Sequence, residues 1–251
     1  IDRGLVGSEM CIRDSTRLVK YFIVMSLFSG IYSASVSGDQ LAAGKSAYTR
    51  GDYSLAFRAF TPLANEGNAE AQTFIGSLYE NGLGVIKDEK NALDWYEKAG
   101  KAGNAKGQHN AGIFYYTGRG VAVNYPAAYE WFLKATNTDY APSQYMIGLM
   151  YHQGHGVAIN FERARLWFLK AAKQGYANAQ FMYAFMVQAG EGAKSDPATA
   201  MVWALVAEMN GKNDTVAITV PAEMTMTEIE VTTAEEIANE CFQSNYQNCP
   251  D

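Results

Sequence analysis

The strongest constraint on the fold is a period of 36 residues that runs without insertion over residues 67–210. The hexapeptides "GNAEAQ", "GNAKGQ", "DYAPSQ" and "GYANAQ" begin at positions 67, 103, 139 and 175. The four tryptophans of the chain all occupy one position of the period: Trp95, Trp131, Trp167 and Trp203. A period of this length indicates a solenoid, in which each unit buries its apolar face against its neighbours.

Each unit reads as two helices joined by a glycine turn. Apolar residues recur at helical spacing, and a G-x-G sequence then ends the first helix, because glycine readily adopts the left-handed conformation of a helix end. The residues placed to cap the second helix are Asp88, Asn124, Asn160 and Asp196. A glycine inside the first helix, as at Gly76, Gly112 and Gly148, costs about 1 kcal/mol relative to alanine, so we expect another helix to pass very close. In the second helix we expect the tryptophan to be buried between two alanines.

Together these positions resemble the Sel1-like repeat, a branch of the tetratricopeptide repeat superfamily. The segment "AQFMYAFMVQAGEGAKSDPATAMVWALVA" is one example. The resemblance covers residues 67–210 and implies an all-α fold, a right-handed α/α superhelical solenoid of helix-turn-helix repeats. Asp139 replaces a glycine of the pattern, and Val187 and Ala204 replace aromatic residues. These departures predict altered packing in the last repeat.

The chain on either side of the repeats divides into three further segments. Residues 1–37 combine an adaptor-like extension with a basic and then apolar stretch typical of a secretory signal peptide; whether this segment is cleaved or kept as an anchor stays open. Residues 38–66 resemble an ordinary tetratricopeptide unit that covers the N-terminal end. We expect residues 211–251 to form a helical cap with a helix over 227–242, while residues 215–221 could be helical or extended.

Composition and cysteine usage indicate where the chain works. Cys241 and Cys249 predict one disulfide, because an even pair in an exported chain is normally oxidised. We therefore expect a periplasmic or secreted protein. The formal net charge of −6, without clustered basic residues, argues against nucleic acid as a partner. After residue 37 no segment is long and apolar enough to span a membrane, and we expect a monomer without a cofactor.

The stretch "YHQGHGVAIN" places His152 and His155 three residues apart, as half of a metal site would. The same two positions hold unrelated residues in the other repeats, for example Glu80 and Leu83 in the first. A zinc site needs further ligands, and only His109 remains among the histidines. We interpret the pair as variable, solvent-facing residues and predict no metal site.

The resemblance to tetratricopeptide proteins implies that the first helices line a concave groove that binds a protein or peptide. The positions that would face it vary between repeats, and from the second repeat onward they are rich in apolar and aromatic residues, as a surface for a protein partner requires. The predicted groove residues are Lys106, His109, Ile113, Tyr116, Tyr145, Leu149, His152, Phe181, Phe185 and Gln188. The equivalent positions elsewhere hold Glu70, Thr73, Ser77 and Glu80 in the first repeat, Pro142 in the third and Asn178 in the fourth. The middle residues Ile113, Leu149 and Phe185 could instead pack on adjacent first helices, and that alternative stays open.

Two functions remain. We expect a non-enzymatic scaffold that binds a protein or peptide in this groove. The alternative is β-lactamase or penicillin-binding activity, which has been ascribed to some cysteine-rich relatives. Those relatives carry cysteine pairs in most repeats, whereas residues 67–210 contain no cysteine and no motif that pairs a nucleophile with a base. The sequence therefore favours the scaffold.

Overall fold

A computed structural model describes residues 38–251, and the expectations for residues 1–37 lie outside this part of the chain. The described residues are helical, without a strand, which confirms the all-α prediction. After a helical segment over residues 38–50, the helices in chain order are α2 Tyr53–Asn65, α3 Ala69–Asn81, α4 Glu89–Lys101, α5 Ala105–Thr117, α6 Tyr125–Ala135, the 3₁₀ turn Thr136–Thr138, α7 Ala141–Gln153, α8 Phe161–Ala172, α9 Ala177–Ala189, α10 Pro197–Met209, α11 Val216–Glu223 and α12 Glu228–Gln243. Within this range every helix is too short or too polar to cross a bilayer.

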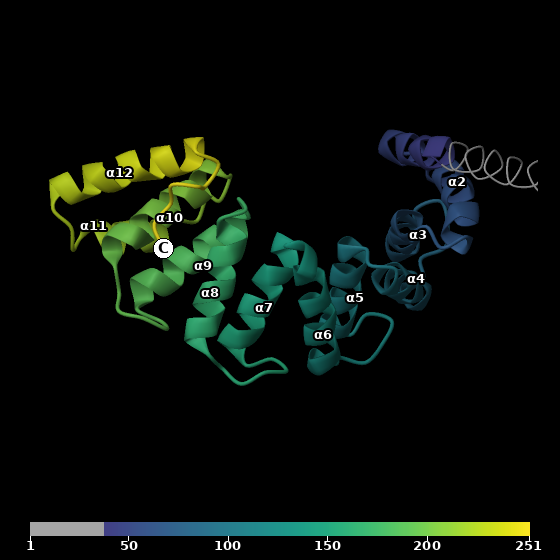
Figure 1. Cartoon of the computed structure of the whole chain (residues 1–251), viewed down its shortest axis with the longest axis horizontal. Helices are drawn as coiled ribbons and strands as arrows, with labels where there is room; N and C mark the ends of the chain where they lie inside the picture. The colour runs from purple at the N-terminus through teal and green to yellow at the C-terminus, as the bar shows by residue number, and fades with distance from the viewer. Residues whose placement is uncertain (1–37) are drawn as a thin grey trace, which may run out of the picture.

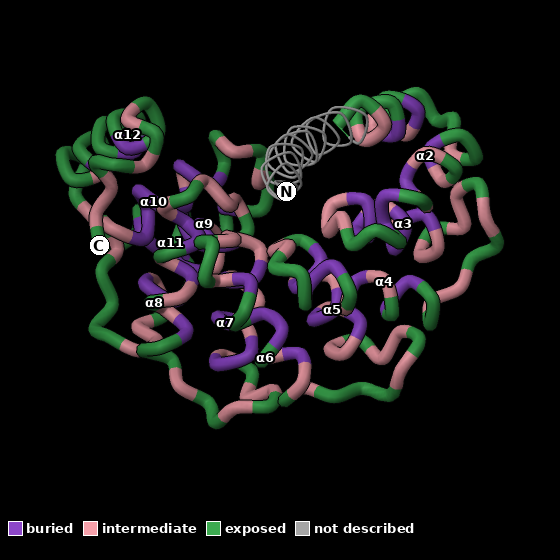
Figure 2. Tube along the Cα trace, turned by 45° about the vertical axis from the view of Figure 1, so that its right-hand side comes forward, coloured by how far each residue is buried: buried purple, intermediate pink, exposed green. Residues whose placement is uncertain are grey.

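The helices form a curved row in which, from α2 to α11, neighbours in sequence are neighbours in space (Figure 1). Each of the four repeats is one packed pair: α3 with α4, α5 with α6, α7 with α8, and α9 with α10. The first helices of the pairs follow the inner side of the curve and the second helices follow its outer side (Figure 2). The buried residues lie between the helices of each pair and between successive pairs.

The predicted caps and turns are present in every repeat. The side chains of Asp88, Asn124, Asn160 and Asp196 each accept a hydrogen bond from the backbone three residues later, and so cap the second helices. The second glycine of each turn has a left-handed backbone and lies against the start of the preceding repeat's second helix. A β-carbon on Gly120 would lie 2.6 Å from the carbonyl oxygen of Glu89. Glycine at this position therefore both turns the chain and lets the repeats stack.

The glycines inside the first helices also allow a close approach, as predicted. A β-carbon on Gly76 would lie 2.7 Å from the ring of Tyr96, and one on Gly112 would lie 2.6 Å from Phe132. The aromatic residue comes from the second helix of the same repeat, at the position after the tryptophan. In the fourth repeat Ala184 and Ala204 occupy this glycine–aromatic pair of positions, and both are fully buried.

The prediction that all four tryptophans are buried is wrong for two of them. Trp203 is fully buried and Trp131 is 8% exposed, but Trp95 and Trp167 are only half-buried. Their rings are partly covered by lysine ammonium groups, as where Lys98 Nζ lies 4.0 Å from the Trp95 ring centroid. Successive residues of a helix point about 100° apart, so the residue after the tryptophan faces the first helix while the tryptophan lies to one side.

The glutamine shared by all repeats ties three of the four repeats to the unit before them. The Nε2 of Gln108 donates a hydrogen bond to the Gly100 carbonyl oxygen at 2.9 Å, and Gln72 and Gln180 make the equivalent bond. Gln144 differs and donates to the Asp139 side chain at 3.4 Å. The difference is local, because α6 ends in the 3₁₀ turn Thr136–Thr138, which leads directly into Asp139.

The C-terminal segment folds back on the last repeat. Residues 215–221, left open by the sequence, belong mostly to α11, and α12 begins with a capping box between Thr227 and Glu230. The predicted disulfide joins Cys241 to Cys249, whose Cα atoms are 4.7 Å apart. Beyond it, the Pro250 carbonyl oxygen accepts a 3.0 Å hydrogen bond from the indole Nε1 of Trp203. The chain end therefore covers the tryptophan of the fourth repeat.

Candidate functional site

The predicted groove residues lie on the first helices, along the inner side of the curve (Figure 2). Within each helix they recur at i, i+3, i+7 and i+10, which keeps them on one face. Lys106 and Phe185 are exposed, Phe185 by 40%. The partly buried members are His109, Ile113, Tyr116, Tyr145, Leu149, His152, Phe181 and Gln188. The structure thus brings the stripe to one side of the molecule but covers much of it.

The cover on the apolar members comes from neighbouring repeats. Ile113 and Leu149 pack partly against the central core, in line with the alternative that the middle residues contact adjacent helices. The Tyr145 ring lies 5.3 Å from the ring of Tyr176 in the following repeat. Phe185, by contrast, keeps an open face. The accessible apolar surface of the stripe therefore lies toward its C-terminal end.

The last-turn residue of three first helices pairs with the turn of the next repeat, 39 residues later. Glu80 Oε1 lies 2.7 Å from Arg119 Nη1, and the Tyr116 hydroxyl lies 2.8 Å from His155 Nδ1. His152 Nε2 lies 2.8 Å from Glu191 Oε2. We call this series of paired residues the seam ladder. Each pair in the series combines different residue types, although the two positions in the repeat are the same.

The seam ladder corrects the interpretation of His152 and His155 as solvent-facing residues. His155 turns back to Tyr116 and stacks on Tyr125 at a ring separation of 4.4 Å, whereas His152 turns forward to Glu191. Both are partly buried, because each turn covers the end of the preceding first helix. The two histidines thus serve different seams. Among residues 38–251 no group of three or more histidine, cysteine, aspartate or glutamate side chains is placed to hold a metal ion.

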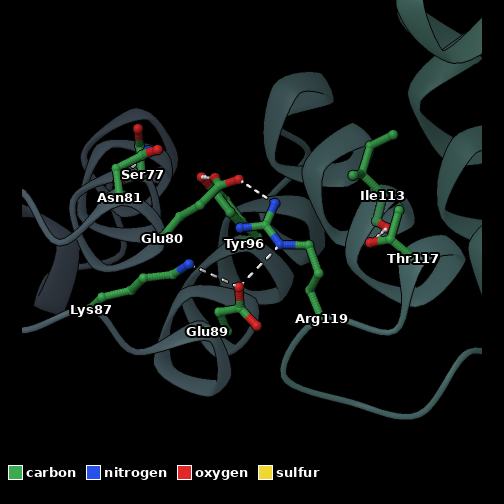
Figure 3. Close-up of polar contacts among 9 residues, drawn as sticks. All are labelled: Ser77, Glu80, Asn81, Lys87, Glu89, Tyr96, Ile113, Thr117 and Arg119. Atoms are coloured by element: carbon green, nitrogen blue, oxygen red, sulfur yellow. Dashed lines mark hydrogen bonds and ion pairs between the residues drawn. The ribbon is translucent and has the colours of Figure 1, made fainter.

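The Glu80–Arg119 pair is part of a larger charged network (Figure 3). Arg119 also reaches Glu89 at 3.3 Å, and Lys87 contacts the same carboxylate at 3.3 Å. Hydrogen bonds from Lys87 and Arg119 lower the pKa of Glu89. The Tyr96 hydroxyl donates to Glu80 Oε2 at 2.5 Å, and burial together with that carboxylate raises the pKa of Tyr96. Every charge in this network is matched, so it fixes the seam between the first two repeats.

A hydrogen-bonded serine–histidine pair, which the sequence analysis did not predict, joins the second and third repeats. His109 Nδ1 lies 2.9 Å from the Ser143 hydroxyl, and burial lowers the pKa of His109 to about 4. The imidazole lies against the rings of Phe132 and Tyr140. The hydroxyl belongs to a fully buried serine, so it cannot meet a substrate in this arrangement. No local sequence motif predicts this contact, because the two residues lie 34 positions apart in the chain.

Comparison with known proteins identifies the repeat. The family described as Sel1 repeat matches residues 69–104, 105–137, 141–176 and 177–212. A Sel1 repeat protein of Oxalobacter formigenes has a similar structure, with a TM-score of 0.69 and 26% identity over 82% of this chain and 85% of that one. The protective antigen c5321 of uropathogenic Escherichia coli, described as having an SLR fold, gives a TM-score of 0.55 and 26% identity over 84% of this chain and 54% of its own length. No curated protein gave a significant match.

Proposed function

This chain belongs to the Sel1 repeat family, and from that premise we propose that it is a non-enzymatic scaffold that binds a protein or peptide on the inner face of its solenoid. The observation that carries the proposal is the contrast between constant and variable positions. The glycines, glutamines and capping residues that pack the repeats recur almost unchanged, while the position that holds Ser77 in the first repeat holds Phe185 in the fourth. A fixed frame that presents different side chains at regular spacing suits recognition of an extended partner.

The exposed members of the stripe are the residues that we propose make first contact. Phe185 offers an accessible aromatic ring, Phe181 lies one turn earlier on the same helix, and Tyr145 occupies the position of Phe181 in the preceding repeat. Aromatic side chains dominate the binding energy of many protein interfaces. The seam ladder residues Tyr116 and His152 are already engaged between repeats, so we assign them a supporting role in shaping the surface.

Capture of partners from a bacterial envelope extract tests this function. Phe185→Ser and Lys106→Glu change exposed positions, so they should leave the helical circular dichroism unchanged while removing the bands that wild type retains. The matched control is Leu166→Ser, because Leu166 is 59% exposed on the outer helix α8. If the control removes the same bands and the two inner-face variants do not, the binding surface lies on the outer side and the proposal is wrong.

We also propose that the chain works outside the cytoplasm, in the periplasm or as a secreted protein. The Cys241–Cys249 disulfide supports this, because disulfides persist in oxidising compartments. We retain the division into an N-terminal unit over residues 38–66, repeats over 67–210 and a cap over 211–251, and we propose a monomer. The β-lactamase alternative has no support from the comparisons or from the buried Ser143.

A further inference from the structure

An exposed apolar stripe runs along α11 and its C-cap residue, at the C-terminal end of the solenoid. Val216, Val220 and Met224 are spaced by four residues and are 63%, 46% and 82% exposed. This spacing places them on one face over about 12 Å, given the rise of an α-helix. Ile229, at the start of α12, is 79% exposed. Exposed apolar groups gathered on one face mark interaction sites.

The stripe is open because α11 takes the place of a first helix without its own second helix. In each of the four repeats the first helix packs on the second helix that follows it, as α9 does on α10. α11 packs on α10 and α9, as a first helix packs on the preceding repeat. The next helix, α12, packs on α10 instead of pairing with α11 (Figure 1). The side of α11 that a second helix would cover is therefore left free.

The seam ladder ends unfinished at the same end of the molecule. Gln188 occupies the position that Glu80, Tyr116 and His152 hold in the earlier repeats. Its Oε1 atom is buried and has no hydrogen-bond partner within the described residues. The side-chain pairs that join one repeat to the next thus stop after the fourth repeat. This agrees with α11 being the first helix of a fifth unit that lacks its second helix.

The charge around the stripe restricts what can cover it. Residues 213–251 contain no lysine or arginine, and their acidic residues are Asp214, Glu223, Glu228, Glu230, Glu235, Glu236, Glu240 and Asp251. The nearest basic residue in sequence, Lys212, is paired with Asp214 at 3.4 Å. A symmetric contact with a second copy would bring two acidic ends together, and an anionic membrane would be repelled. Charge complementarity favours a cationic partner.

We propose that the exposed face of α11 docks a basic amphipathic helix of another protein, in the place that a second helix takes in a complete repeat. Apolar side chains at i and i+4 of that helix meet Val216, Val220 and Met224. Its lysines or arginines flank the contact and face Glu223 and Glu228. This surface is separate from the inner face of the solenoid, so the proposal stands or falls independently of the function proposed above.

The test uses two labelled helical peptides of about 16 residues as probes, measured by fluorescence anisotropy. One carries leucines along one face and lysines elsewhere, and the other has glutamate in place of every lysine. The lysine peptide should bind the wild-type protein at least about tenfold more tightly than the glutamate peptide. The variant Val216→Ser/Val220→Ser/Met224→Ser should weaken its binding at least about tenfold. Equal binding of both peptides would overturn the proposal.

A matched control separates a defined site from general stickiness. Ile159→Ser/Leu166→Ser removes two apolar residues with 60% and 59% exposure from other parts of the surface. It should leave binding unchanged, as should Phe185→Ser on the inner face. If the triple variant loses helical signal, Glu223→Gln/Glu228→Gln provides the second measurement, with an expected severalfold weakening that disappears at high salt. Full binding by that variant at low salt would contradict the proposed charge match.

Two further measurements distinguish the other occupants. Sedimentation of the wild-type protein alone should show no dimer that the triple variant abolishes, and such a dimer would assign the face to a second copy. Vesicles that contain phosphatidylglycerol should not retain the protein, and retention lost in the triple variant would assign the face to a membrane. Either result would overturn the basic helix as the occupant.

Discussion

The first three repeats and the fourth solve the same packing problem with different residues. In the first three, a glycine of the first helix receives an aromatic ring of the second, as where Gly148 receives Phe168. In the fourth, Ala184 and Ala204 share the space. One residue grows by a methyl group as the other loses its ring, so the two helices can still pair. Across the four repeats of this chain, the fit between the two helices is kept while the identity of both residues changes.

The loss of that ring in the fourth repeat is accompanied by a change at the neighbouring tryptophan. Trp167 in the third repeat is half-buried beneath Lys170, whereas Trp203 is fully buried and bonded to Pro250. The fourth repeat has no complete neighbour on its far side, and the disulfide-bonded chain end provides the cover. A solenoid needs such a cap because its last unit otherwise exposes its packing face.

The largest effect that tests this comparison is expected at the aromatic position. Phe168→Ala should lower the free energy of unfolding by about 3–5 kcal/mol, because it empties a fully buried site against Gly148. Trp167→Ala should cost clearly less, because that side chain is only partly buried. Chemical denaturation of the two variants measures the difference. If Trp167→Ala lowered the free energy of unfolding as much as Phe168→Ala or more, the tryptophan would be the main packing residue and the comparison would be wrong.

A second substitution sharpens the same comparison. Adding Gly148→Ala to Phe168→Ala recreates the alanine pair of the fourth repeat, and should recover about 1 kcal/mol through cavity filling and helix propensity. Gly148→Ala alone should destabilise, since its β-carbon would lie 2.7 Å from the ring. Gly148→Ala should therefore raise the free energy of unfolding in the Phe168→Ala background and lower it in the wild-type background. This change of sign is expected if the two residues pack against each other.

The second repeat places a histidine, His109, at its seam with the third repeat. Burial lowers the pKa of His109 from its ordinary value of 6.5 to about 4. Between these two pH values the imidazole is therefore neutral in the folded protein but protonated in the unfolded chain. Stability should therefore fall as pH drops from about 6.5 to 4, by up to about 3 kcal/mol. Denaturation at a series of pH values measures this loss. His109→Gln should remove that part of the pH dependence, and an unchanged profile would contradict the assignment.

The cap of the fourth repeat should contribute slightly less. Cys241→Ser/Cys249→Ser should lower stability by about 2–3 kcal/mol, since it releases a short closed loop in the unfolded chain. The freed end should also expose Trp203, with a red shift in its emission, while Trp167 is unaffected. Mass spectrometry after alkylation checks the starting state. Two alkylated thiols at these positions without prior reduction would show that the bond does not form.

The smallest effect concerns the irregular start of the third repeat. Asp139 has φ 53°, whereas Gly67, Gly103 and Gly175 occupy the same position with φ of 95°, 87° and 79°. Asp139→Gly should raise the free energy of unfolding by about 0.5 kcal/mol, because relief of left-handed strain slightly exceeds the added entropy of the unfolded chain. The reverse change, Gly103→Asp, should destabilise. If Asp139→Gly lowered stability instead, the hydrogen bond between Asp139 and Gln144 would contribute more than the backbone strain costs.

Much of this architecture could be derived from the sequence because its determinants are local or repeated. The N-cap role of Asp88 depends on the next three residues, and the glycine turns depend on backbone conformation alone. The pairing of Cys241 with Cys249 required only an oxidising compartment and two nearby cysteines. The resemblance to tetratricopeptide proteins implied the positions of the groove stripe, and its role in binding stays a prediction.

The tertiary structure alone decided which side chains meet across the seams. The pairing of His152 with Glu191 and of His155 with Tyr116 joins residues 39 positions apart, and depends on how one repeat rotates and settles on the next. The same is true of His109 with Ser143, and of the choice of Phe168 over Trp167 as the buried ring. The period determines that the repeats stack, but the distance and angle between them arise from the summed packing of many side chains, which no single stretch of sequence contains.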